Sequence, residues 1–164
     1  GTPHRDELPP GNPAPQVEEE IHVPEKVNED ENEVERVKTR LEKDHIICGY
    51  HTVINWDKAN TDHCSAVIQV SAKPERDSGY DRIARRIARF SEVTNLYLTS
   101  GGSEFLVMIE GKTMREVSDF VAMKLAPIEG VTATVTCFLL KQYKVAGIIL
   151  DDEEVLDERK LVQP

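Results

Sequence analysis

The chain has 164 residues, a formal net charge of −10 and 39% hydrophobic residues. This length corresponds to one or two small domains, since typical domains run to about 100–150 residues. The sequence contains neither an apolar stretch of the ~18 residues that a membrane-spanning helix needs nor a secretory signal, so we expect a cytoplasmic protein with no membrane partner.

The acidity is concentrated near the two ends of the chain. Residues 1–45 carry a net charge of −7, residues 46–143 carry none, and residues 144–164 carry −3. An acidic chain does not attract nucleic acid through its overall field, so DNA binding would have to use a local basic face. The three cysteines are few and odd in number, which favours free thiols in a reducing compartment over a disulfide framework.

The first 60 residues predict one short helix and a linking segment. Residues 1–16 hold five of the nine prolines, which predicts a segment that is disordered or was added for expression. Residues 17–45 have helix-like composition, although Pro24 would interrupt a continuous helix. Within them, residues 31–44 predict a helix, because apolar residues recur at helical spacing: Val34, Val37 and Leu41. Residues 46–60 predict a linking strand, Ile46–Asn55, followed by a turn.

Residues 61–143 predict a single domain of six elements. In chain order these are a strand (65–72), a helix (80–90), two strands (93–100 and 103–110), a helix that starts at 114 and a strand (131–140). Gly101-Gly102 lies between two β-rich runs and predicts a hairpin turn. Thr113 and Glu116 form a capping box at the start of the second helix. The order β-α-β-β-α-β predicts an α+β, ferredoxin-like fold with two helices on one face of a four-stranded sheet.

The second face of this sheet does not have a solvent-like composition. The strand over 103–110 is apolar on both faces, with Val107 on one and Met108 on the other. Apolar patches on an open sheet face mark interfaces. We therefore expect the sheet to stack on a second copy of the chain, which gives a homodimer.

A group of histidines and cysteines between residues 45 and 64 raises the question of a metal site. In the predicted strand, His45 and His51 would face one way and Cys48 the other, because side chains alternate along a strand. The sequence also contains no Cys-x-x-Cys pair, the usual element of a structural zinc site. We therefore expect no metal.

The sequence also gives little support to catalysis. It contains no nucleophile elbow, phosphate-binding loop or Rossmann glycine run, so we expect no cofactor and no enzyme. A small dimeric α+β enzyme is kept as a distant alternative, with a pocket lined by Tyr97, Thr99 and Glu104.

Helix 80–90 carries four arginines away from its apolar side: Arg82, Arg85, Arg86 and Arg89. We interpret them as a solvated helix face that is balanced by nearby carboxylates. The alternative is a contact with the acidic residues 151–158 of the same or a neighbouring subunit.

Three stretches of the sequence resemble the Lrp/AsnC family of bacterial and archaeal transcription factors. Residues 34–50 (VERVKTRLEKDHIICGY) resemble the end of the family's recognition helix and the wing that follows it. Residues 90–105 (FSEVTNLYLTSGGSEF) resemble its signature of Glu-Val, a strand and Gly-x-x-acid, and residues 130–136 (GVTATVT) resemble its final strand. The resemblance covers roughly residues 34–143, and residues 144–164 resemble the acidic tail of a Gram-positive branch.

This resemblance implies a two-part organisation. It implies a ferredoxin-like βαββαβ ligand-binding and dimerisation domain at 61–143, preceded by a degenerate winged helix-turn-helix remnant at 17–45. In this family an amino acid or similar small effector binds between dimers, against the Gly-x-x-acid turn, and dimers join into tetramers or octamers. The family usually has aspartate where this chain has Glu104. The effector-binding residues so implied are Thr99, Ser100, Gly101, Gly102, Ser103 and Glu104, with Thr134 and Thr136 on the neighbouring strand.

The resemblance favours a transcriptional regulator that modulates DNA binding through assembly. The DNA contacts it implies are Arg36, Lys38, Arg40 and Lys43. The net charge of −7 over residues 1–45 favours an alternative, because DNA readers normally present a concentrated basic face. That alternative is an effector-binding oligomerisation module that lacks DNA binding and regulates a protein partner.

Overall fold

The computed structural model describes residues 30–151 and separates into two compact units, with the boundary between Thr52 and Val53. The expectations for residues 1–29, including the interruption at Pro24, and for the acidic residues 152–164 lie outside the described residues. Within the described part, no helix is long and apolar enough to cross a membrane.

The described part of the first unit contains helix α2, Glu31–Lys43, as predicted. Asp30 caps it, because its carboxylate accepts a hydrogen bond from the backbone N–H of Glu33 at 2.9 Å. The predicted apolar stripe is confirmed: Leu41 is buried, and Val34 and Val37 are half-buried. Two residues after the end of the helix, His45 has a left-handed φ of 57°, and there the backbone turns out of the helical path.

The predicted strand over Ile46–Asn55 does not form. A strand is stable only when its backbone groups pair with a neighbouring strand, and the boundary between the two units falls inside this segment. The predicted turn over 56–60 is instead a single helical turn, α3 (Trp56–Ala59), which ends at Asn60 with φ 56°. Residues 46–55 are therefore a connecting segment that is not paired with any strand among the described residues.

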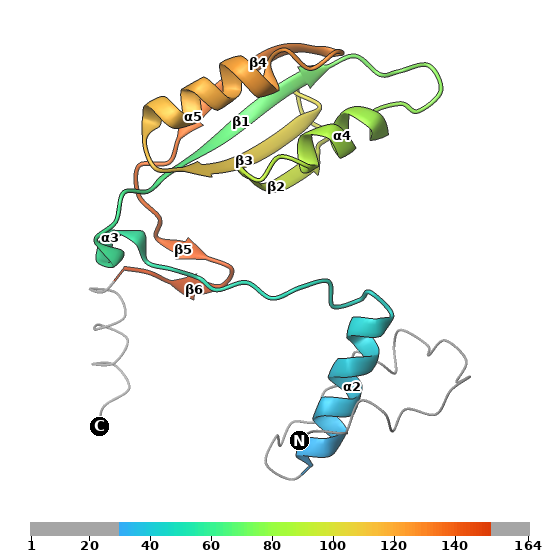
Figure 1. Ribbon diagram of the computed structural model, residues 1–164, viewed down its shortest axis with the longest axis vertical. Helices are drawn as coiled ribbons and strands as arrows, with labels where there is room; N and C mark the ends of the chain where they lie inside the picture. The colour runs from blue at the N-terminus through green and yellow to red at the C-terminus, as the bar shows by residue number, and fades with distance from the viewer. Residues whose placement is uncertain (1–29, 152–164) are drawn as a thin grey trace. The chain divides into compact units, whose positions relative to one another are not determined.

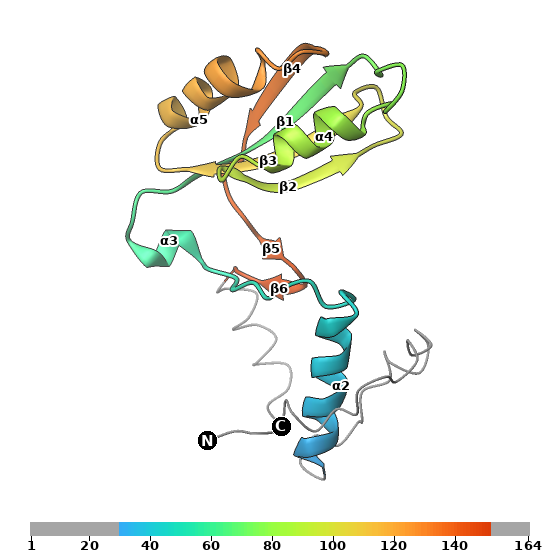
Figure 2. The same cartoon turned by 45° about the vertical axis from the view of Figure 1, so that its right-hand side comes forward.

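The second unit is built on a four-stranded antiparallel sheet (Figure 1). Its strands lie in the order β2-β3-β1-β4, and the two crossover helices lie on the same side of the sheet (Figures 1 and 2). This confirms the predicted α+β, ferredoxin-like arrangement. The elements are β1 (Cys64–Ala72), α4 (Asp81–Ala88), β2 (Val93–Leu98), β3 (Phe105–Gly111), α5 (Met114–Phe120) and β4 (Val131–Phe138).

The core of this unit lies between the sheet and the two helices. Alternate residues of β1 and β3 face it, and the paired residues Ile68 and Val107 are both completely buried. Each such side chain contributes about 1.5–3 kcal/mol by leaving water. From the helices, Ile83 and Ile87 of α4 and Val117 and Phe120 of α5 belong to the same cluster. Ala88 and Met114 follow the same apolar spacing in the sequence but are exposed.

Helix α5 begins at the predicted cap and is followed by a wider, π-helical turn. The Thr113 hydroxyl accepts a hydrogen bond from the Glu116 N–H at 3.1 Å. The Glu116 carboxylate accepts in return from the N–H of Lys112. The last turn is a π-helix, η2 (Val121–Leu125), in which Ala126 donates to the carbonyl of Val121 five residues earlier. Val121 and Leu125 are both buried in the core.

The register of β4 shows which of its faces is covered. Thr134 lies opposite Val70 and Thr136 lies opposite Ile68, so the threonines face the helix-covered side. The apolar residues between them face the open side, where Val135 is 54% exposed. At Ser71/Ala72 a bulge shifts the register of this pairing by one residue, so that Ala72 lies opposite Val131.

Two connections differ from their predictions. The β2–β3 hairpin forms, but its connection spans residues 99–104, because β2 ends at Leu98 and β3 begins at Phe105. Residues 144–149, expected to belong to the acidic tail, form a small hairpin of β5 (Lys144–Val145) and β6 (Ile148–Ile149). Its turn uses two residues in the left-handed region, Ala146 and Gly147, as in the type I′ turns of two-residue hairpins.

Candidate functional site

The predicted effector residues at 99–104 form a closed loop at one end of the sheet. The backbone N–H of Thr99 donates to the carbonyl of Glu104 at 2.8 Å, and the Thr99 hydroxyl donates to the carbonyl of Ser103 at 2.7 Å. The Glu104 carboxylate accepts a hydrogen bond from the backbone N–H of Ala72 at 2.8 Å. This last contact ties the loop to the end of β1 and fixes the direction of the carboxylate.

The two glycines of this loop are not needed for its backbone conformation. Neither Gly101 nor Gly102 has a φ in the left-handed region. A Cβ atom at Gly102 would meet nothing within 4 Å, and one at Gly101 would only approach the Thr99 hydroxyl at 3.9 Å. The loop surface at Ser100, Gly101 and Gly102 is exposed, so the glycines leave the backbone open to a ligand.

The two predicted threonines of β4 lie at the same end of the sheet, across β1. Thr134 and Phe105 both pair with Val70, so each is one strand away from β1, about 4.8 Å on either side. Thr136 is one pleat further along β4. The structure therefore brings Thr134 to the level of the loop but separates it from the loop by the width of β1.

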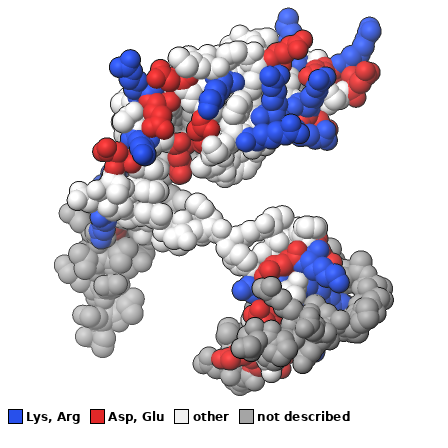
Figure 3. All heavy atoms as spheres, viewed as in Figure 1, with Lys and Arg blue, Asp and Glu red and all other residues white. Residues whose placement is uncertain are grey.

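A basic cleft of about 440 Å³ opens at this same end of the sheet. It starts at Lys73, the residue after Ala72, and includes the first turn of α4 and the turn at Gly130. Its basic lining residues are Lys73, Arg76, Arg82 and Arg86, and Figure 3 shows Lys and Arg side chains gathered over α4. Of its two carboxylates, Glu75 is 3.7 Å from the Arg82 guanidinium, so positive charge predominates in the cleft.

The predicted DNA contacts on α2 do not share one face. At 100° per residue, Arg36 and Lys43 lie on the side of the helix opposite the buried Leu41, and the half-buried Arg40 lies on the flank beside them. Lys38 lies on another side of the helix, where its ammonium is 5.1 Å from the centre of the Tyr50 ring.

Tyr50 itself is held at the end of the same helix. Its hydroxyl donates to the Glu42 carboxylate at 2.8 Å. Local desolvation, this hydrogen bond and the negative charges of Glu42 and Glu35 raise the pKa of Tyr50 above its ordinary value. The cation and the carboxylate together fix the aromatic ring beside α2.

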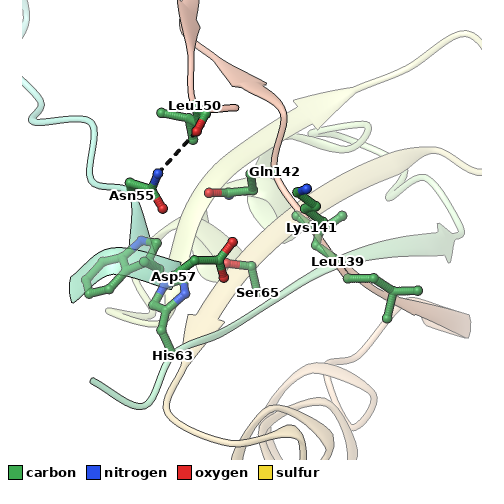
Figure 4. A pocket seen from close by; sticks show the side chains of 10 residues that line it. Asn55, Asp57, His63, Ser65, Leu139, Lys141, Gln142 and Leu150 are labelled. Atoms are coloured by element: carbon green, nitrogen blue, oxygen red, sulfur yellow. Dashed lines mark hydrogen bonds between the residues drawn. The ribbon is translucent and has the colours of Figure 1, made fainter. Parts of the chain in front are cut away.

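A second pocket, of about 80 Å³, lies at the opposite end of β1 (Figure 4). We call it the Trp56 pocket; its polar and aromatic lining residues include Trp56, Asp57, His63, Ser65, Lys141 and Gln142. No sequence motif marks this pocket, because its walls come from segments 95 residues apart that are joined by a hydrogen bond from Asn55 to the carbonyl of Leu150. His63 and Cys64 belong to the group of histidines and cysteines between residues 45 and 64 that the sequence suggested only as possible metal ligands. Among residues 30–151, no group of three or more potential ligands could hold a metal ion.

Comparison with known proteins identifies the family. Residues 65–149 match the family described as the Lrp/AsnC ligand binding domain. The chain is 38% identical over 134 residues to the uncharacterized HTH-type transcriptional regulator YugG of Bacillus subtilis, covering 81% of this chain and 80% of that one.

Solved structures agree with this assignment at the level of the fold. The transcriptional regulator NMB0573 of Neisseria meningitidis, solved as a complex with L-Met, has a TM-score of 0.58 at 23% identity, covering 76% of this chain and 84% of that chain. Escherichia coli AsnC has a TM-score of 0.54 at 19% identity, covering 70% and 77%.

The chain belongs to the Lrp/AsnC family of transcriptional regulators. It is thus a regulator with a ligand-binding domain and not an enzyme. The distant alternative of a small dimeric enzyme is therefore excluded, and the resemblance seen in the sequence is confirmed.

Proposed function

We propose that this regulator senses an amino acid or related small molecule at the 99–104 loop. The observation that carries the proposal is the pairing of opposite charges at one end of the sheet. The Glu104 carboxylate is held by Ala72, and the basic cleft begins at the next residue, Lys73. A carboxylate suits an α-ammonium group, and guanidinium groups suit an α-carboxylate. The L-Met complex of the Neisseria regulator supports this ligand class.

The test uses a substitution that removes charge and keeps the structural hydrogen bond. In Glu104→Gln, the amide oxygen can still accept from the Ala72 N–H, but the negative charge is lost. Titration of L-methionine and L-leucine into the full chain, followed by calorimetry and light scattering, should show binding that this variant weakens at least tenfold. The matched control is Asp119→Gln, an exposed carboxylate on α5, which should bind like the parent. Equal binding by both variants would contradict the assigned role of Glu104.

We further propose that the chain assembles as dimers through the open face of the sheet, and that effector binding between dimers changes the size of the assembly. The open face carries Tyr97, which is 50% exposed, and Val135, together with the less exposed Val67 and Met108 paired across β1 and β3. Such a contiguous apolar surface is the kind that interfaces cover.

A charge on this face should separate the dimer. Val135→Asp is expected to yield monomers in analytical ultracentrifugation, because a carboxylate would be buried without a partner. Met114→Asp replaces an equally exposed methionine at the first turn of α5, where an acidic residue is favourable, and should keep the dimer. A dimeric Val135→Asp variant would show that another surface forms the interface.

We propose that the outward side of α2, which carries Arg36, Arg40 and Lys43, contacts DNA. Each phosphate contact contributes a slope of about −0.9 to the dependence of log K on log salt. Replacing Arg36 and Lys43 by alanine should therefore reduce the slope by about two per chain, whereas Arg115→Ala on α5 should leave it unchanged.

A second function is favoured by the net charge of −7 over residues 1–45. It is an oligomerisation module that binds an effector but not DNA and regulates a protein partner. A gel shift that shows no salt-dependent DNA binding at all would favour it over the DNA-binding regulator.

A further inference from the structure

The Trp56 pocket contains two buried polar atoms without hydrogen-bond partners among residues 30–151: the Ser65 hydroxyl oxygen and Nε2 of His63. Ser65 is only 9% exposed. Nε2 of His63 lies 3.7 Å from a carboxylate oxygen of Glu110, which is beyond hydrogen-bond length. Buried polar groups are nearly always satisfied in folded proteins. Two unsatisfied groups that line one pocket therefore indicate that something polar binds there.

The walls of the pocket hold these groups rigidly. The Trp56 and His63 rings are stacked with centroids 3.9 Å apart and an interplanar angle of 4°. Ser65 lies on β1, where its carbonyl accepts from the Leu139 N–H at 2.9 Å. Figure 4 shows the side chains of Asp57, Ser65 and Gln142 directed toward the same space.

The charges around the pocket select the class of ligand. Asp57 and Lys141 line it together, and Glu110 lies near His63. The two carboxylates disfavour a simple anion, and the lysine disfavours a simple cation. A molecule that carries both a positive and a negative group can pair with both Asp57 and Lys141, while its polar atoms satisfy Ser65 and His63.

The size of the pocket restricts this class to small molecules. One water molecule needs about 10–15 Å³ of cavity volume. A pocket of about 80 Å³ therefore has room for a ligand of on the order of six non-hydrogen atoms. We propose that the Trp56 pocket is a second binding site, specific for a small zwitterion such as a short α-amino acid. It is separate from the 99–104 loop, because Ser65 and Ala72 are at opposite ends of β1, about 23 Å apart at 3.3 Å per residue.

The chain provides its own reporter for this site, because Trp56 is its single tryptophan. Its fluorescence in the 164-residue chain should change saturably on titration with L-alanine. L-Lactate lacks the ammonium group of L-alanine and isopropylamine lacks the carboxylate, so each should bind at least tenfold more weakly. The titration is repeated at two protein concentrations.

Two conservative variants test the assigned contacts. Asp57→Asn removes the carboxylate charge and should weaken the L-alanine response at least tenfold. Ser65→Ala removes only the buried hydroxyl and should weaken it severalfold. The matched controls on α5, Asp119→Asn and Ser118→Ala, change exposed residues and should respond like the parent.

Three results would overturn the proposal. An unchanged Trp56 signal at tens of millimolar L-alanine would mean that the pocket holds only water. A signal that follows protein concentration and ignores L-alanine would mean that a second copy of the chain fills it. Equal responses to L-alanine and L-lactate would refute the zwitterion. Because assembly reports on the 99–104 loop and Trp56 reports on this pocket, either site can fail without the other.

Discussion

Gly130 lies in the turn between η2 and β4, and its replacement by alanine should be costly. Its φ is +96°, and an added Cβ would lie 2.7 Å from Cδ1 of Ile83, which is 2% exposed. Backbone strain of this kind costs about 1–3 kcal/mol, and overpacking a core costs about 1–3 kcal/mol. The Gly130 carbonyl also accepts a hydrogen bond from the Lys73 N–H at 2.8 Å, which helps to hold the backbone in this conformation.

We therefore expect Gly130→Ala to lower the free energy of unfolding by about 2–4 kcal/mol. For a chain of this size, that corresponds to a fall in Tm of about 5–15 °C. The measurement is urea and thermal unfolding at one fixed protein concentration, since assembly makes Tm concentration-dependent. The matched control is Gly102→Ala, where an added Cβ meets nothing and stability should hold or rise by about 0.4–1 kcal/mol. If the two variants unfold at the same temperature, the assignment of strain to Gly130 is wrong.

Two further predictions concern local contacts. Thr113→Ala removes the acceptor of the Glu116 N–H and should cost about 1 kcal/mol in urea unfolding; an unchanged midpoint would show that the cap contributes nothing. Desolvation raises the pKa of Glu92, but hydrogen bonds from its own backbone N–H, from Lys124 at 3.1 Å and from Ser91 outweigh it and hold the pKa below the ordinary value of 4.5. This stabilisation is complete above about pH 4.5 and is lost as the pH falls through the lower pKa of the folded state. Lys124→Met should therefore lower stability by up to about 1 kcal/mol at pH 7 and by less at pH 3, and an equal loss at both would contradict the ion pair.

Elements set by neighbouring residues could be predicted from the sequence. The cap at Thr113 needs only the residue three positions on, and the buried side of β1 follows from simple alternation. Helix α2 likewise follows from apolar spacing and the acidic first turn. These are interactions between residues close in the chain, so their pattern is visible without the fold.

Features that depend on distant partners could not be predicted in the same way. The segment 46–55 has strand-like residues, but no ladder forms there. In β4 the alternation shows which residues share a face, yet only the pairing of Thr134 with Val70 shows which face the helices cover.

The candidate sites differ in the same respect. The 99–104 loop is a contiguous motif and could be found from its resemblance to the family. The anchoring of Glu104 by Ala72, 32 residues away, could not. The Trp56 pocket carries no local motif, because Asn55 and Leu150 meet only in the folded chain.

The open face of the sheet has a consequence for how large assemblies of this chain can grow. If a surface binds its own copy about a two-fold axis, each chain uses that surface once and the contact closes at two. Any further growth must then use different surfaces, such as the loop end of the sheet, and must add dimers as units. Stable assemblies should therefore contain even numbers of chains, and odd multiples of the chain mass should be absent.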